Sequence, residues 1–173
     1  MRRERPRPRT QDPLAGRRTK ARRVLVVGIG NPGRGDDGLG AAAVARLERR
    51  RLPGVTCDAN YQLAIEDALA CAESDAVVFV DAARGLRVPF RWSEVRPEAA
   101  APALSHALGP GAVLGLCAAL YDRTPVARLL AIRGHRWGVG EGLSPRAAAN
   151  LGRAVRSLAG YVRRATAGKE PRP

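Results

Sequence analysis

The sequence predicts an α/β fold in three layers, with helices covering both faces of a mostly parallel sheet. Two observations support this prediction. Short apolar runs rich in β-branched residues alternate along the chain with Ala-rich or amphipathic stretches of helical length. Strands and helices that alternate in this way are typical of right-handed parallel crossovers. Because no internal repeat is present and the chain has 173 residues, we expect one domain.

The first half of the chain supplies three predicted strands and two predicted helices. The strands are 24–29, 55–59 and 76–80, and the helices are 38–51 and 66–72. The first strand, VLVVGI, is apolar along its whole length, which predicts burial on both faces. The first helix is expected to end before Pro53 and Gly54.

The second half supplies two further strands and two helices. Residues 87–95 alternate in polarity and contain Pro89, which favours a strand at the edge of the sheet. A helix is predicted over 110–120, starting at a proline, and a strand over 127–132. A long amphipathic helix is predicted over 144–164, with Ser144 as its N-cap and Pro145 in its first turn.

The formal charge of +14 is concentrated at the N-terminus. Residues 1–23 carry nine Arg and Lys20 against Glu4 and Asp12, a net charge of +8, and only two of the 30 basic residues in the chain are Lys. The positive charges of the remaining residues are scattered, so we expect no nucleic-acid binding. Arg, Pro and few apolar residues predict a disordered tail over 1–22, a domain over 23–166 and a second tail over 167–173.

The sequence also predicts a cytoplasmic location. No apolar stretch approaches the ~20 residues that a membrane span needs, and no apolar region of a signal peptide follows the paired arginines 2–3. The three cysteines, Cys57, Cys71 and Cys117, lack CxxC spacing and suit reduced thiols in a cytosolic protein.

A glycine-rich loop, GIGNPGRGDDGLG, follows the first strand. Gly28, Gly30 and Gly33 satisfy the GxGxxG pattern of dinucleotide-binding enzymes, and Asp58 could bind a ribose. Against this alternative, the adjacent carboxylates of Asp36 and Asp37 stand where a pyrophosphate would sit and would repel it. Pro32 also removes one N–H donor from the loop.

Asp37 follows the first strand of the sheet and Asp81 follows the third. In a 2-1-3 strand order these two strands are neighbours, and ligands collect beyond their carboxyl ends. Taken alone, the acidic pair 36–37 could simply cap a helix and favour its dipole. The addition of Asp81, at the end of a buried strand where an unpaired carboxylate is costly, favours a functional cleft.

Two histidines are candidate third ligands. His106 lies just before the helix predicted over 110–120, from where it could return to the same cleft. His135 is flanked by Arg133 and Arg136, which oppose metal binding. Two carboxylates and one imidazole suit Ni²⁺ or Zn²⁺ better than Ca²⁺, and three protein ligands leave positions open for water or substrate.

Four segments in this order, GIGNPGRGDDGLG, VVFVDA, SHALGP and IRG…GEGLSP, resemble the nickel–iron hydrogenase maturation endopeptidases. The resemblance covers about residues 23–165. It implies a twisted five-stranded sheet with one antiparallel strand, the one that contains Pro89. It also implies that Asp37, Asp81 and His106 recognise a metal, with Asp36 as a possible orienting residue.

The activity implied by the resemblance is removal of a C-terminal extension from the hydrogenase large-subunit precursor after nickel insertion. The nickel would be supplied by that precursor, which is the implied partner, although zinc could bind the same residues in vitro. A carboxylate or a metal-polarised water would act as the general base. We expect a monomer, and we expect Glu66 and Asp67 to form a solvated helix face rather than a site.

Overall fold

The computed structural model describes residues 22–98, 108–140 and 142–169. Within these residues a five-stranded sheet has the order β2-β1-β3-β5-β4. The strands are β1 (Val24–Ile29), β2 (Val55–Asn60), β3 (Ala76–Ala83), β4 (Phe90–Val95) and β5 (Val126–Arg133). All neighbours are parallel except β4 and β5. The predicted class, the mostly parallel sheet and the antiparallel edge strand are confirmed.

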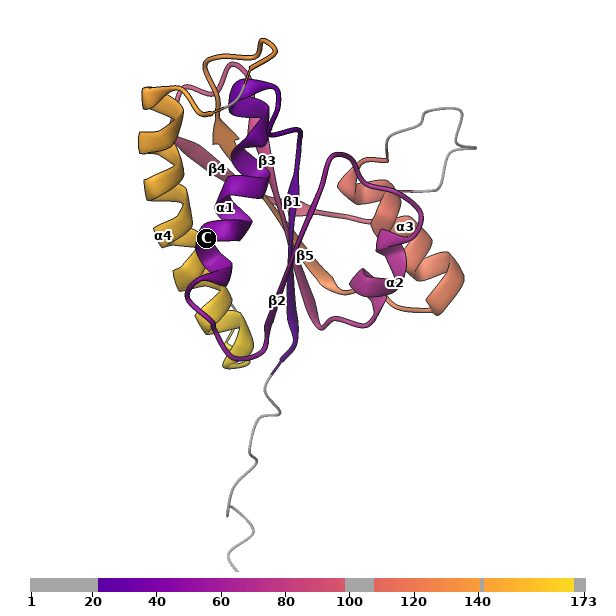
Figure 1. The fold of residues 1–173 in the computed structure, drawn as a ribbon. Helices are drawn as coiled ribbons and strands as arrows, with labels where there is room; N and C mark the ends of the chain where they lie inside the picture. The colour runs from indigo at the N-terminus through magenta and orange to yellow at the C-terminus, as the bar shows by residue number, and fades with distance from the viewer. Residues whose placement is uncertain (1–21, 99–107, 141, 170–173) are drawn as a thin grey trace, which may run out of the picture.

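Helices cover both faces of the sheet (Figure 1). Helices α1 (Leu39–Glu48) and α4 (Pro145–Thr166) pack on one face, and α2 (Asp67–Ala72) and α3 (Pro110–Tyr121) pack on the other. A short 3-10 turn, η1 (Gly35–Gly38), leads into α1. At the start of α4, the Ser144 side chain accepts a hydrogen bond from the backbone N–H of Ala147 and Pro145 occupies the first turn, as predicted.

The core is divided by the sheet into two apolar clusters. Val24 and Val26 of β1 face α1 and α4, whereas Leu25 and Val27 face α2 and α3. All four side chains are buried, which explains why this strand is apolar along its length instead of alternating. The described residues contain no helix that is long and apolar enough to span a membrane.

Three element boundaries differ from the prediction by three residues, and the other differences are of one or two residues. Helix α1 ends at Glu48, not at 51, because the chain tightens and Arg51 adopts a left-handed conformation (φ 45°). Strand β4 begins at Phe90, just after Pro89, which has no N–H to give to a ladder. Strand β3 continues through Asp81 to Ala83, because β5 pairs with these residues.

The three cysteines are free thiols. Burial raises the pKa of Cys57 to about 11 and that of Cys71 to about 12. Cys117 donates to the carbonyl oxygen of Ala68 (3.2 Å), so it joins α3 to α2. These are packing residues of the core, as their burial and raised pKa values indicate.

The two predicted tails lie mostly beyond the described ranges. Residues 1–21 and 170–173 fall outside the described part of the chain, and so does the whole segment 99–107 that contains His106. At the C-terminus α4 runs to Thr166, whose carbonyl oxygen accepts a hydrogen bond from the N–H of Arg22 (3.1 Å).

Candidate functional site

The candidate site lies at the carboxyl ends of β1 and β3, where the chain leaves the two strands in opposite directions. The last residue of β3 that pairs with β1 is Val80, opposite Gly28. Asp81 therefore stands one residue beyond the β1 ladder, while β5 still supports it on the other side through Ala131. Asp37 belongs to η1, which crosses this same edge of the sheet.

Glycines bring η1 and α1 close enough to place the two acids together. A Cβ atom on Gly40 would collide with the carbonyl oxygens of Ile29 and Val80, which end β1 and precede Asp81. A Cβ atom on Gly30 (φ +119°) would collide with the carbonyl oxygen of Asp37. Of the three glycines that suggested a dinucleotide fingerprint, Gly28 and Gly30 are therefore explained by close packing, against the backbones of Gly40 and Asp37.

The Asn-Pro-Gly turn of the loop orients Asp37. The backbone N–H of Asn31 donates to Asp37 Oδ2 (2.9 Å). The Asn31 side chain in turn accepts from the N–H of Gly33 (2.8 Å), which closes the turn. The carboxylate is half-buried, and this is the one hydrogen bond that it accepts within the described residues.

Asp81 is also half-buried, and it likewise accepts one hydrogen bond within the described residues. Its Oδ1 accepts a hydrogen bond from the N–H of Ala82 (2.7 Å), the next residue in the chain. Burial raises the pKa of Asp81 to about 6, the Ala82 N–H works against this rise, and the charge of Asp37 adds to it. The two carboxylates are thus close enough to repel each other, which is the arrangement that a bound cation relieves.

Asp36 has the opposite environment. Its side chain is fully buried and accepts hydrogen bonds from the N–H groups of His135 (2.6 Å), Arg136 (2.7 Å) and Ser144 (2.7 Å) and from the Ser144 hydroxyl (2.8 Å). Burial alone would raise the pKa of Asp36, but these hydrogen bonds outweigh it and hold the pKa below its usual 3.8. Asp36 is therefore a structural carboxylate whose charge is stabilised by four hydrogen bonds.

The neighbouring acids therefore do not cap their own helix. Neither η1 nor α1 has a side-chain cap hydrogen bond. Asp36 instead accepts hydrogen bonds from Ser144, which lies 108 residues later in the sequence and is the residue that caps α4. Gly134 makes this possible, because a Cβ at that position would meet both Trp137 and the Cβ of Asp36.

The loop offers no backbone cradle for a pyrophosphate. Each N–H from Gly30 to Asp37, apart from Pro32, which has none, donates to a protein oxygen. The donors and acceptors are Gly30 to Asn60 O, Asn31 to Asp37 Oδ2, Gly33 to Asn31 Oδ1, Arg34 to Asn31 O, Gly35 to Gly140 O, Asp36 to Arg136 O and Asp37 to Arg34 O. The exposed Asp58 binds Ala59 and Asn60 next to it. The geometry therefore does not favour the dinucleotide alternative.

One of the two histidines, His135, lies in the described part of the chain, and the other, His106, does not. His135 donates its backbone N–H to Asp36, and its Nε2 lies 3.3 Å from Asn150 Nδ2. His106 lies outside the described residues, so its relation to Asp37 and Asp81 stays a prediction. Among the residues that the structure describes, no group of three His, Cys, Asp or Glu side chains could hold a metal.

Sequence reasoning missed two structural roles. Glu66 is exposed as expected, but Asp67 accepts hydrogen bonds from Asn60 Nδ2 (2.8 Å) and the N–H of Ala64 (2.7 Å), so it braces the connection from β2 to α2. The second role is that of Asn31, whose turn orients Asp37. An Asn-Pro-Gly sequence is a recognisable signal for such a turn.

Two hollows lie beside the start of α1, and Pro32 and Ala41 line both of them. One, of about 320 Å³, is lined mainly by apolar groups, including Pro32, Ala42 and Leu143. The other, of about 280 Å³, lies between Gly30, Asn60 and Tyr61.

No protein-family model matches the sequence, and no curated protein matches it either. Solved structures do match. The [NiFe] hydrogenase maturation protease HycI from Thermococcus kodakarensis KOD1 is 23% identical with a TM-score of 0.67, over 82% of this chain and 92% of that protein. The hydrogenase maturating endopeptidase HybD from E. coli is 20% identical with a TM-score of 0.63, over the same shares. An endopeptidase from Escherichia coli is 24% identical with a TM-score of 0.64, over 86% of this chain and 95% of that chain. The chain thus has the fold of these proteases.

Proposed function

We propose that this chain is a hydrogenase maturation endopeptidase that removes the C-terminal extension of a nickel–iron hydrogenase large-subunit precursor. The observation that carries the proposal is the pairing of Asp37 and Asp81 at the carboxyl edge of the sheet, in a fold shared with such proteases. His106 is the third proposed ligand.

The state of the two carboxylates supports a role in binding a cation. Asp36 accepts four hydrogen bonds, whereas Asp37 and Asp81 each accept one within the described residues. Two poorly satisfied carboxylates that raise each other's energy gain most from a divalent ion. Their oxygens, together with the imidazole of His106, form a donor set that suits Ni²⁺.

In this proposal the nickel belongs to the substrate and acts as a checkpoint. A precursor loaded with nickel would engage the three side chains, and the peptide would be held with its scissile bond beside them. A precursor without nickel would bring no positive charge to offset the repulsion between Asp37 and Asp81. It would therefore dock poorly.

The chemistry that the site can supply is hydrolysis of a peptide bond. A water molecule attacks the scissile carbonyl carbon and gives its proton to a carboxylate or to a base of the substrate complex. The C–N bond then breaks, and the leaving amine takes up a proton.

The test is processing of a nickel-loaded large-subunit precursor, followed by mass spectrometry of its C-terminus. The native chain is expected to cleave it, whereas Asp37→Asn, Asp81→Asn and His106→Ala are expected not to. Asp58→Asn, an exposed acid at the end of the neighbouring strand β2, is the matched control and should cleave normally. Unchanged processing by all three site variants would rule out the site, and equal cleavage of nickel-free precursor would rule out the checkpoint.

A further inference from the structure

A third hollow, of about 410 Å³, lies where β5 ends and β4 begins, against the first three turns of α4. The polar side chains that line it are Arg87, Arg133, His135, Arg146, Asn150 and Arg153. The lining thus contains four guanidinium groups, one imidazole and one amide, with no carboxylate. Its position is distinct from Asp37 and Asp81, which do not line it.

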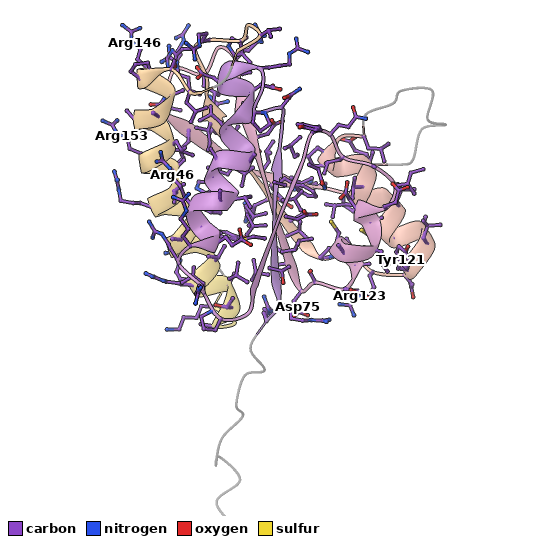
Figure 2. All side chains as sticks on the ribbon, viewed as in Figure 1. Arg46, Asp75, Tyr121, Arg123, Arg146 and Arg153 are labelled. Carbon is purple, nitrogen blue, oxygen red and sulfur yellow. The ribbon has the colours of Figure 1, made fainter. Side chains whose placement is uncertain are left out.

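Hydrogen bonds connect three of the residues that line this hollow, Asn150, Arg133 and Pro89. Arg146, Asn150 and Arg153 follow helical spacing and so share one face of α4. Asn150 Nδ2 donates to the carbonyl oxygen of Arg133 (3.0 Å), and the N–H of Arg133 donates to the carbonyl oxygen of Pro89 (3.0 Å). Figure 2 shows Arg146 and Arg153 projecting outward from α4.

The positive charges of the hollow are not neutralised within the described residues. Within the described residues the salt bridge found joins Arg96 and Glu94, which lie outside the hollow. The four arginines of the hollow form none in that part of the chain. Helix α4 contains five arginines and no acid, and Glu141 is the one acidic residue of the sequence between 126 and 169. Four like charges in one hollow repel each other, and the N-terminal end of α4 adds further positive potential.

We propose that this hollow binds a small oxyanion that carries two or more negative charges, of the phosphate or polycarboxylate class. Guanidinium groups match the planar, bidentate geometry of such oxygens, and several of them are needed to balance more than one charge. A monovalent anion would leave most of the repulsion in place. The proposal does not depend on the protease activity, because neither Asp37 nor Asp81 takes part in it.

The test is isothermal titration of the full chain in about 150 mM NaCl, where surface charges are screened beyond roughly 8 Å. Inorganic pyrophosphate and citrate are the probes, and acetate is the monovalent control. Pyrophosphate or citrate is expected to bind saturably at one site, and acetate is not. The double variant Arg146→Gln/Arg153→Gln should bind the same probe at least about tenfold more weakly, because it loses two charge-assisted contacts.

Two further variants separate a built site from general basicity. Arg123→Gln/Arg163→Gln removes the same charge from exposed positions outside the hollow, and its affinity should stay within about twofold of the native value. Ala149→Glu places a carboxylate at an exposed lining position of α4 and should weaken binding as the arginine variant does, without removing an arginine. Equal loss in the Arg123/Arg163 variant, or no saturable binding of either probe, would overturn the proposal. Tight binding of a hexaglutamate peptide that pyrophosphate cannot displace would also overturn it.

Discussion

Replacing Asp81 by Asn is expected to make the metal-free protein more stable at pH 8, although most substitutions at half-buried positions destabilise a fold. The reason is the raised pKa of this carboxyl group, about 6 against a usual 3.8. A folded state that holds its proton more tightly than the unfolded state loses stability as pH rises from about 4 through 6, and the full penalty remains above pH 6.

The magnitude follows from the pKa difference. One pKa unit corresponds to 1.36 kcal/mol, so a difference of about two units gives an upper limit near 3 kcal/mol at pH 8. Because Asp81 is only half-buried, about 1–3 kcal/mol is the expected gain for Asp81→Asn at that pH. At pH 4 the same substitution should change stability by only about 0.5 kcal/mol, since the native carboxyl group is then protonated when folded.

The assay is urea unfolding of both proteins, followed by circular dichroism, at pH 4 and pH 8 in the presence of a chelator. Asp58→Asn is the control, because this carboxylate on β2 is exposed. It should give no comparable gain at either pH. Asp37→Asn should lower the pKa of Asp81, because it removes the neighbouring negative charge. If Asp81→Asn destabilised the protein at pH 8, or if its effect did not depend on pH, the destabilisation of the Asp81 carboxylate by burial, to which the charge of Asp37 adds, would be refuted.

Three other substitutions or reactions test the framework of the site. Asp36→Asn should destabilise the fold by roughly 3–5 kcal/mol in urea at pH 7, because an amide cannot accept all four hydrogen bonds; since the pKa of Asp36 is depressed, the difference from the native chain should shrink as pH falls below about 4. Gly40→Ala should cost about 3 kcal/mol or more, measured by thermal unfolding, because its Cβ meets two carbonyl oxygens; a loss below 1 kcal/mol would contradict this close packing. Cys71 should react with a thiol reagent at pH 8 far more slowly than a free thiol, because burial raises its pKa to about 12, and rapid labelling of the folded chain would contradict its burial.

Most of the fold could be predicted from the sequence because each element has a strong local signal. The apolar run of β1, the Ser-Pro start of α4 and the proline before β4 each predict their element within a few residues. The boundaries that differ depend on partners elsewhere in the chain. Strand β3 extends past Asp81 because β5 pairs with these residues. The sequence of β3 alone does not indicate this pairing.

The acidic pair of the site could also be predicted, because its logic is topological. Acids that follow neighbouring parallel strands meet at one edge of the sheet, and the order β2-β1-β3 places Asp37 and Asp81 there. The glycine-rich loop also suggested a dinucleotide site, which the geometry does not favour. The GxGxxG pattern gives the positions of glycines but not the structural reason for each glycine. In this chain a Cβ atom on Gly28 or Gly30 would collide with the backbone of Gly40 or Asp37, and the N–H groups from Gly30 to Asp37 already donate to protein oxygens.

Asp36 and Asp37 show where sequence reasoning must stop. The two residues are adjacent and chemically identical, so no local pattern distinguishes the structural acid, Asp36, from the acid of the proposed site, Asp37. The difference lies in how many donors reach each carboxylate, and the donors to Asp36 come from residues 135–144, about a hundred positions away. Because those donors already satisfy Asp36, a cation gains little from it. Asp37, in contrast, is close enough to Asp81 to raise its pKa and accepts one hydrogen bond within the described residues. A substrate metal should therefore select the second acid of the pair, so Asp37→Asn should abolish processing with little loss of stability, and Asp36→Asn should do the reverse at temperatures where it remains folded.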